Sequence, residues 1–76
     1  MLNQRPLLSS LDVGIIVREA RKAQGLTQGD LVGLTGLGRR FISDLESGKE
    51  TSQLGKTIQV LSALGVALTA SWRWDE

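Results

Sequence analysis

The segment GLTQGDLVGLTGLGRRFISDLESGK, residues 25–49, decides the fold that this chain adopts. Thr27 is placed to cap a helix, and Asp30 three residues later gives a weak form of the capping box. Gly36 ends that helix, and Gly38 stands where another short helix begins. Two helices joined by so tight a turn predict a helix-turn-helix, in which a glycine commonly makes the turn.

Helical periodicity continues on both sides of this segment. We expect a helix over residues 10–24 with Ser10 as its N-cap, and a fourth helix that Thr51 or Ser52 caps and Gly65 ends. The apolar positions expected to face the core of the four helices are Val13, Ile16, Val17 and Ala20, then Leu31 and Leu34, then Ile42 and Leu45, then Leu54, Ile58, Leu61 and Leu64.

The tail VALTASWRW, residues 66–74, changes to a period of two, which is typical of a strand with one apolar face. A lone strand needs a partner for its backbone groups, and the chain itself offers only a short arm around Leu7-Leu8. Pairing with the same strand of a second copy is the simplest solution and predicts a homodimer. The side chains expected on the dimer strand are Val66, Leu68, Ala70, Trp72 and Trp74.

The chain has 76 residues, which is room for one small core. We expect an N-terminal arm over residues 1–10, a helical domain over residues 11–65, and a dimerisation strand and tail over residues 66–76. Four glycines inside the expected helices cost about 1 kcal/mol each relative to alanine, so the monomer should be only marginally stable. These glycines are Gly14, Gly29, Gly33 and Gly55.

Composition argues against an enzyme. The chain lacks cysteine, histidine and tyrosine, which removes thiolate zinc sites and the usual general base. The run GLTGLGRR has the two-glycine spacing of a phosphate loop but no following Lys-Ser/Thr and no preceding strand, which disfavours a nucleotide-binding enzyme. We therefore expect no catalytic residues, no metal, no cofactor and no small-molecule substrate.

Charge is uneven although the net charge is only +1. Residues 18–40 carry five basic and two acidic side chains, so polyanion binding is expected in the middle of the chain. Asp12 interrupts the apolar N-terminal stretch before a signal sequence forms, and the longest weakly polar run is too short to span a bilayer. A cytoplasmic protein without a membrane partner is expected.

The central segment resembles the helix-turn-helix of the lambda and 434 repressor superfamily, the XRE family. The residues that match its pattern are Thr27, Gln28, Leu31, Gly36, Leu37, Ile42, Ser43, Glu46 and Gly48. Val32 departs from the usual alanine, and Gly38 replaces a capping serine or threonine, so no hydroxyl can contact a phosphate there. The resemblance implies a mainly α fold of four helices, to which the terminal strand is added.

Within that superfamily, RRFISDLESGK followed by QLGKTIQVLSALGV and a terminal strand is similar to the HipB-like antitoxins. This resemblance implies a dimeric repressor that binds palindromic double-stranded operator DNA in its own operon and also binds a HipA-type kinase toxin. A plain XRE-type repressor without a toxin, and a protein-binding adaptor without an operator, remain as alternatives.

Arg39 and Arg40 open the third helix, the part that a helix-turn-helix inserts into the major groove. Adjacent helical residues point about 100° apart, so one is expected to read a base and the other to hold a phosphate, with Arg39 preferred as the base reader. A solvated charge pair is the plainer interpretation. The resemblance assigns Gln28 to the DNA backbone, and Thr27 at the same amino end can face a phosphate besides its capping role.

Phe41 is expected to pack against the second helix more readily than to contact a thymine methyl group. Ser43 and Lys49 are further candidate phosphate contacts. Asp44 could accept from a cytosine amino group or repel wrong sequences.

Two further pairs of residues have expected structural roles. The resemblance implies an internal ion pair between Arg21 and Glu46 that holds the first helix to the third. Trp72 and Trp74 are interpreted as apolar bulk of the dimer strand, with an anchor for a toxin as the alternative.

Overall fold

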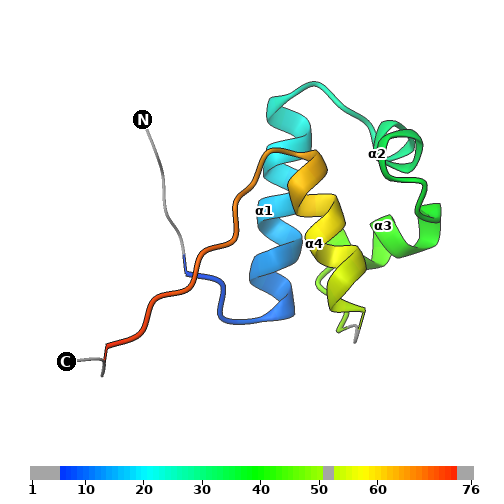
Figure 1. Ribbon diagram of the computed structural model, residues 1–76. Coiled ribbons are helices and arrows are strands. Elements are labelled where there is room, and N and C mark those ends of the chain that lie inside the picture. The colour runs from blue at the N-terminus through cyan, green and yellow to red at the C-terminus, as the bar shows by residue number, and fades with distance from the viewer. Residues whose placement is uncertain (1–5, 51–52, 74–76) are drawn as a thin grey trace.

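A computed structural model of the chain describes residues 6–50 and 53–73, and it shows four α-helices in that part (Figure 1). Their bounds are α1 Ser10–Ala23, α2 Gln28–Thr35, α3 Arg39–Glu46 and α4 Leu54–Ala63. α3 packs against both α1 and α2, and α2 also packs against α4. The fold is therefore the predicted helix-turn-helix with one supporting helix on either side in the sequence.

The N-cap of α1 is Ser9, not the predicted Ser10. Ser9 has an extended backbone, and its hydroxyl accepts a hydrogen bond from the Asp12 N–H at 3.3 Å. The Asp12 carboxylate in turn accepts from the Leu8 N–H at 2.9 Å. These two bonds fix the start of the helix one residue earlier than expected, so Ser10 is already helical.

The caps around the turn are as predicted. The Thr27 hydroxyl accepts from the Asp30 N–H at 3.0 Å, and the Asp30 carboxylate accepts from the Thr27 N–H at 2.8 Å, so the capping box is complete. Gly36 ends α2 in the left-handed region at φ 73°, and Gly38 is the N-cap of α3. For α4 the N-cap is Gln53, while the predicted caps at 51 and 52 lie outside the described residues.

The core joins all four helices. Its buried apolar side chains are Val17, Leu31, Ile42, Leu45, Val60, Leu61 and Leu64, with Val13, Ile16 and Ala20 packed against them. The predicted inward faces of α1 and α3 are confirmed by this arrangement.

Three leucine and isoleucine positions predicted to be buried are exposed instead. Leu34 is 61% exposed, Leu54 66% and Ile58 43%. The inward face of α2 runs through Leu31 with Val32 and Thr35 half-buried beside it, which turns Leu34 outward. On α4 the inward face is Thr57, Val60, Leu61 and Leu64, the i, i+3, i+4, i+7 pattern that begins three residues after Leu54.

The segment after α4 leaves the helical domain as an extended chain (Figure 1). Residues 66–73 form no strand within the described part of the single chain, so the dimer strand stays a prediction. Val66 is half-buried against the core, whereas Leu68 and Trp72 are 47% and 56% exposed. Trp74 lies outside the described residues.

None of the helices in the described ranges has the length and apolar character that crossing a membrane would require.

Candidate nucleic-acid interface

The turn between α2 and α3 is held by a chain of hydrogen bonds centred on Thr35. Its hydroxyl donates to the Leu31 carbonyl at 2.7 Å and accepts from the Leu37 N–H at 3.2 Å. The Gln59 amide on α4 donates to the Thr35 carbonyl at 2.9 Å. These bonds satisfy backbone groups that the end of α2 leaves unpaired, and they set the orientation of α3 relative to α2 and α4.

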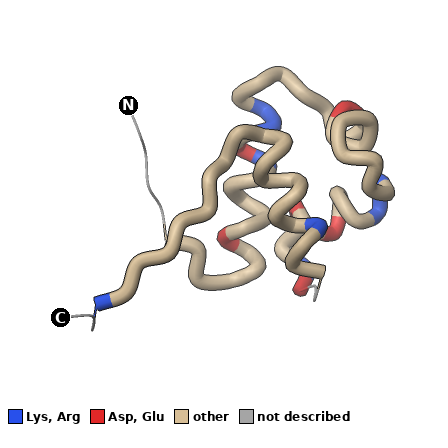
Figure 2. The backbone as a smooth tube through the Cα atoms, in the orientation of Figure 1, with Lys and Arg blue, Asp and Glu red and all other residues tan. Residues whose placement is uncertain are grey.

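α3 has one buried and one exposed face. Ile42 and Leu45 are buried in the core, whereas Arg39, Arg40 and Ser43 are exposed. In Figure 2 the basic positions at the start of α3 lie on the outer edge of the backbone, away from the C-terminal segment. The two arginines predicted from the sequence are therefore accessible together at the leading end of one helix.

Arg39 lies across the amino end of α2. A Cβ atom added to Gly29 would come within 2.8 Å of the Arg39 guanidinium, and within 3.6 Å of the Thr27 hydroxyl oxygen. The absence of a side chain at Gly29 therefore leaves room for Arg39. This position brings a guanidinium next to the positive end of a helix, an arrangement that suits an anionic group.

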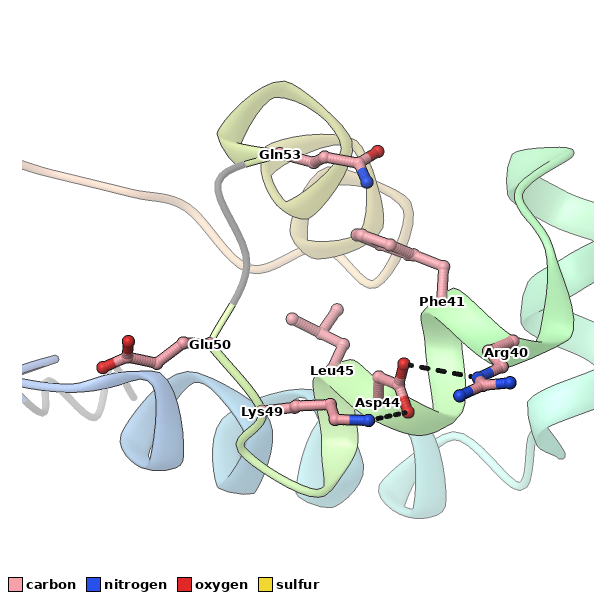
Figure 3. Close-up of a pocket in the computed structure, with 7 residues that line it drawn as sticks. All are labelled: Arg40, Phe41, Asp44, Leu45, Lys49, Glu50 and Gln53. Carbon is pink, nitrogen blue, oxygen red and sulfur yellow. Dashed lines mark ion pairs between the residues drawn. The ribbon is translucent and has the colours of Figure 1, made fainter.

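Arg40 points along α3 into a shallow groove of about 270 Å³ between α3 and the start of α4 (Figure 3). Its Nε lies 3.8 Å from Asp44 Oδ2, and the Lys49 Nζ lies 3.8 Å from Asp44 Oδ1. One carboxylate thus faces two cations, each on a different oxygen. The Arg40 side chain is 86% exposed and the Lys49 side chain 60%, so both cations are available to a ligand.

Phe41 is half-buried and packs against the core, as expected, but toward a different helix. Its ring points toward α4 in Figure 3, and Lys56 of α4 places its Nζ 5.9 Å from the ring centre. Packing against α2 was predicted. This cation–π contact joins Lys56 to Phe41, one of the residues that line the groove.

Glu46, at the end of α3, is the centre of the polar contacts inside the fold. Arg21 donates to it with two bonds, Nε to Oε2 at 2.6 Å and Nη2 to Oε1 at 2.9 Å. Arg21 also donates to the Leu26 carbonyl at 2.8 Å, and Gln28 donates from its amide to Glu46 Oε1 at 3.2 Å. The ion pair that the resemblance implied is thus present and joins α1 to α3.

These contacts hold Glu46 in its charged form. Burial raises the pKa of Glu46, but the hydrogen bonds from Arg21 and Gln28, together with the positive charge of Arg21, outweigh it, so that its pKa lies below the ordinary value. The hydrogen bond to Glu46 likewise raises the pKa of Arg21. The pair is fully charged at neutral pH.

Sequence reasoning missed three contacts of the candidate residues. Asp44 was considered only as a base contact or a repulsive group, and its two ion pairs with Arg40 and Lys49 were not expected. The i, i+4 spacing of Arg40 and Asp44 was a signal that could have revealed the first. Gln28 was assigned to the DNA backbone by resemblance, and its bond to Glu46 across the turn carried no sequence signal.

This arrangement of α2, the turn and α3 matches a known protein family. A family model described as "Helix-turn-helix" matches residues 17–70, which includes the whole of α2, the turn and α3. The chain belongs to this helix-turn-helix family, of the XRE type.

Two relatives and one structural neighbour are similar to this chain. The uncharacterized HTH-type transcriptional regulator y4mF of Sinorhizobium fredii (strain NBRC 101917 / NGR234) is 53% identical over 57 residues, 75% of each chain. The restriction-modification controller protein C.AhdI from Aeromonas hydrophila is 31% identical, with a TM-score of 0.67 over 76% of this chain and 84% of that one. A chain of a HipA-HipB-O2-O3 complex is 20% identical with a TM-score of 0.80, covering 90% of this chain and 96% of that one, which shows a shared fold.

Proposed function

We propose that this protein is a dimeric transcriptional repressor that binds palindromic operator DNA with α3 in the major groove. The observation that carries the proposal is the pair Arg39 and Arg40 at the exposed start of α3, whose opposite face is fixed in the core by Ile42 and Leu45. A recognition helix needs this combination, because its base-reading side chains are useful only if the helix axis is held rigidly.

The residues around α3 supply the rest of a DNA-binding surface. Arginine can donate two hydrogen bonds to guanine O6 and N7, worth about 1–3 kcal/mol of discrimination. Thr27 and Gln28 at the amino end of α2, with Arg39 lying over that end, suit a backbone phosphate. Ser43 and Lys49 lie on the exposed side of α3 and of the turn that follows it, where further phosphate contacts form.

The test is a binding measurement with the double variant Arg39→Ala plus Arg40→Ala on duplex DNA from the region upstream of the protein's own gene. We expect a loss of at least a hundredfold in affinity, because two charge-assisted contacts are removed. The matched control is Arg18→Ala plus Lys22→Ala, which removes the same charge from the exposed side of α1. We expect it to change affinity less than tenfold.

Binding of the wild-type protein should also weaken steeply with salt, because it releases counterions from the phosphates. Retention of full affinity by the α3 double variant, or an equal loss in the α1 control, would refute the assignment of α3 as the recognition helix.

We further propose that the protein is the antitoxin of a HipA-type kinase and represses its own operon. Two observations support this: the HipB-like motif over α3 and α4, and the fold shared with a chain of the HipA-HipB-O2-O3 complex along nearly its whole length. Co-expression with the product of a neighbouring kinase-like gene should yield a stable complex and relieve growth arrest. Absence of such a gene, or of a complex, would favour a plain repressor.

The likeness to the controller protein C.AhdI, at 31% identity, supports that plain regulator as the second candidate. An adaptor that binds only protein predicts no affinity for any duplex, so the same DNA measurement separates it from both regulators.

A further inference from the structure

Asp44 is unusual among the residues of the proposed DNA surface because it carries a negative charge on the exposed side of the recognition helix. Its side chain is 39% exposed, and its two oxygens face Arg40 and Lys49 at 3.8 Å each (Figure 3). A carboxylate beside a polyanion costs free energy by repulsion, so its presence there calls for a compensating role.

The orientation of the first contact suggests that role. The ion pair joins Asp44 to the Nε of Arg40, and because 86% of the Arg40 side chain is exposed, its two terminal Nη groups stay open to a ligand. Those two groups are a matched pair of donors for guanine O6 and N7. A long, 86% exposed arginine would otherwise sample many rotamers. A carboxylate one helical turn away reduces these rotamers to those in which the two Nη groups of Arg40 remain free to donate.

The second contact acts on phosphate binding. Lys49 follows α3, in the turn that leads to α4, and is a point charge that binds any phosphate regardless of sequence. Held near Asp44, this ammonium is partly neutralised, as is Arg40. The protein then gains less binding free energy from phosphate contacts on DNA of a wrong sequence.

We propose that Asp44 determines specificity: it orients Arg40 as the guanine-reading side chain and restrains Arg40 and Lys49 from sequence-independent phosphate contacts. The inference rests on the proposed operator binding and assigns base reading to Arg40 rather than to Arg39, whose guanidinium lies over the amino end of α2.

The chain offers a matched control in the same groove. Glu50 also lines it and is exposed, but it forms no ion pair with Arg40 or Lys49 within the described residues. In Figure 3 its carboxylate points away from Asp44. Glu50→Gln therefore removes the same charge from another residue of the same groove without removing a partner of the two cations.

The experiment compares wild type, Asp44→Asn and Glu50→Gln on two probes: a duplex selected by the wild-type protein from a random library, and a shuffled duplex of equal length. For Asp44→Asn we expect affinity for the shuffled duplex to rise about five- to tenfold at 0.1 M salt, with a steeper salt slope by about one unit, because one more phosphate contact forms. Affinity for the selected duplex should fall or stay level, so the specificity ratio falls at least about fivefold.

A change of less than twofold in that ratio, or an equal change in Glu50→Gln, would overturn the inference, because the effect would then be absent or due to net charge alone. In the Arg40→Gln background, Asp44→Asn should lower the ratio less than it does in the wild-type background, because only the release of Lys49 remains. An undiminished further loss would overturn the role of Asp44 in orienting Arg40. If the wild-type protein selects no consensus sequence, the proposed operator binding fails, and this inference fails with it.

Discussion

At the scale of single residues, Glu46 connects three segments that are distant in the sequence. It accepts two bonds from Arg21 of α1 and one from Gln28 of α2, and its side chain is only 5% exposed. A buried charge with one partner removed costs about 3–5 kcal/mol, whereas an intact pair contributes little net. Glu46 therefore matters chiefly through what its loss would leave unpaired, namely the guanidinium of Arg21.

We expect Glu46→Gln to lower the free energy of unfolding at pH 7 by about 2–4 kcal/mol, because the amide can still accept one bond but leaves the Arg21 charge uncompensated. Urea unfolding monitored by circular dichroism measures this. Glu50→Gln is the exposed control, for which less than about 0.5 kcal/mol is expected.

The Arg21–Glu46 ion pair also predicts in which direction the free energy of unfolding changes with pH. The pKa of Glu46 in the folded state lies below its ordinary value of 4.5. A depressed pKa contributes stability that is present above the unfolded value and is lost as the pH falls through the folded value. The stability difference between wild type and Glu46→Gln should therefore be constant above about pH 5.5 and shrink as the pH falls below 4.5. A difference independent of pH down to 3 would contradict the charged pair.

At the scale of elements, the crossing of α1 over the end of α3 depends on Gly14. This glycine is buried, and an added Cβ would lie 2.5 Å from the Leu45 carbonyl oxygen, 2.8 Å from that of Glu46 and 3.0 Å from the Gly48 nitrogen. All three are backbone atoms that cannot move without shifting α3. Gly14 was expected only to weaken its helix, but here its small size allows the closest approach between the two helices.

Gly14→Ala should thus destabilise the fold by about 2–3 kcal/mol, even though alanine is the better helix former by about 1 kcal/mol. Gly33→Ala on α2 is the matched control, because nothing lies within 4 Å of its added Cβ. It should gain about 0.5–1 kcal/mol from helix propensity alone. Thermal unfolding of both variants measures these changes in stability. A Gly14→Ala variant more stable than wild type would show that α1 and α3 can move apart at this contact without a cost in free energy.

At the scale of the whole molecule, the C-terminal segment has no partner within the described part of the chain. Residues 66–73 are extended but pair with no strand in the described part of the chain, and Leu68 and Trp72 expose apolar surface. Both features fit a segment that pairs with its counterpart in a second copy.

A dimer joined in this way has a melting temperature that depends on protein concentration. We expect a rise of about 5–10 °C over a hundredfold increase in concentration, since association stabilises only the folded form. Trp72→Ala should flatten this dependence, while Leu34→Ala, at an equally exposed apolar position on α2, should leave it intact. A concentration-independent melting temperature in the wild-type protein would exclude the folded dimer.

The sequence by itself determined the helix-turn-helix. The capping box of Thr27 and Asp30, the left-handed glycines that follow the four helices, and the inward pair Ile42 and Leu45 are local signals, because each depends on residues within one or two turns of the same helix. The exposed arginines follow from the same periodicity. The family was therefore recognisable before any packing was known.

Only the tertiary structure decided what those residues contact. Leu34, Leu54 and Ile58 obey helical spacing yet lie outside the core, because the neighbouring helices and not the period choose which face is covered. The position of Arg39 over Gly29 and the contact of Gly14 with α3 each join segments whose proximity in space no local pattern encodes. The sequence thus placed the basic residues on the right helix, and the fold assigned them their different partners.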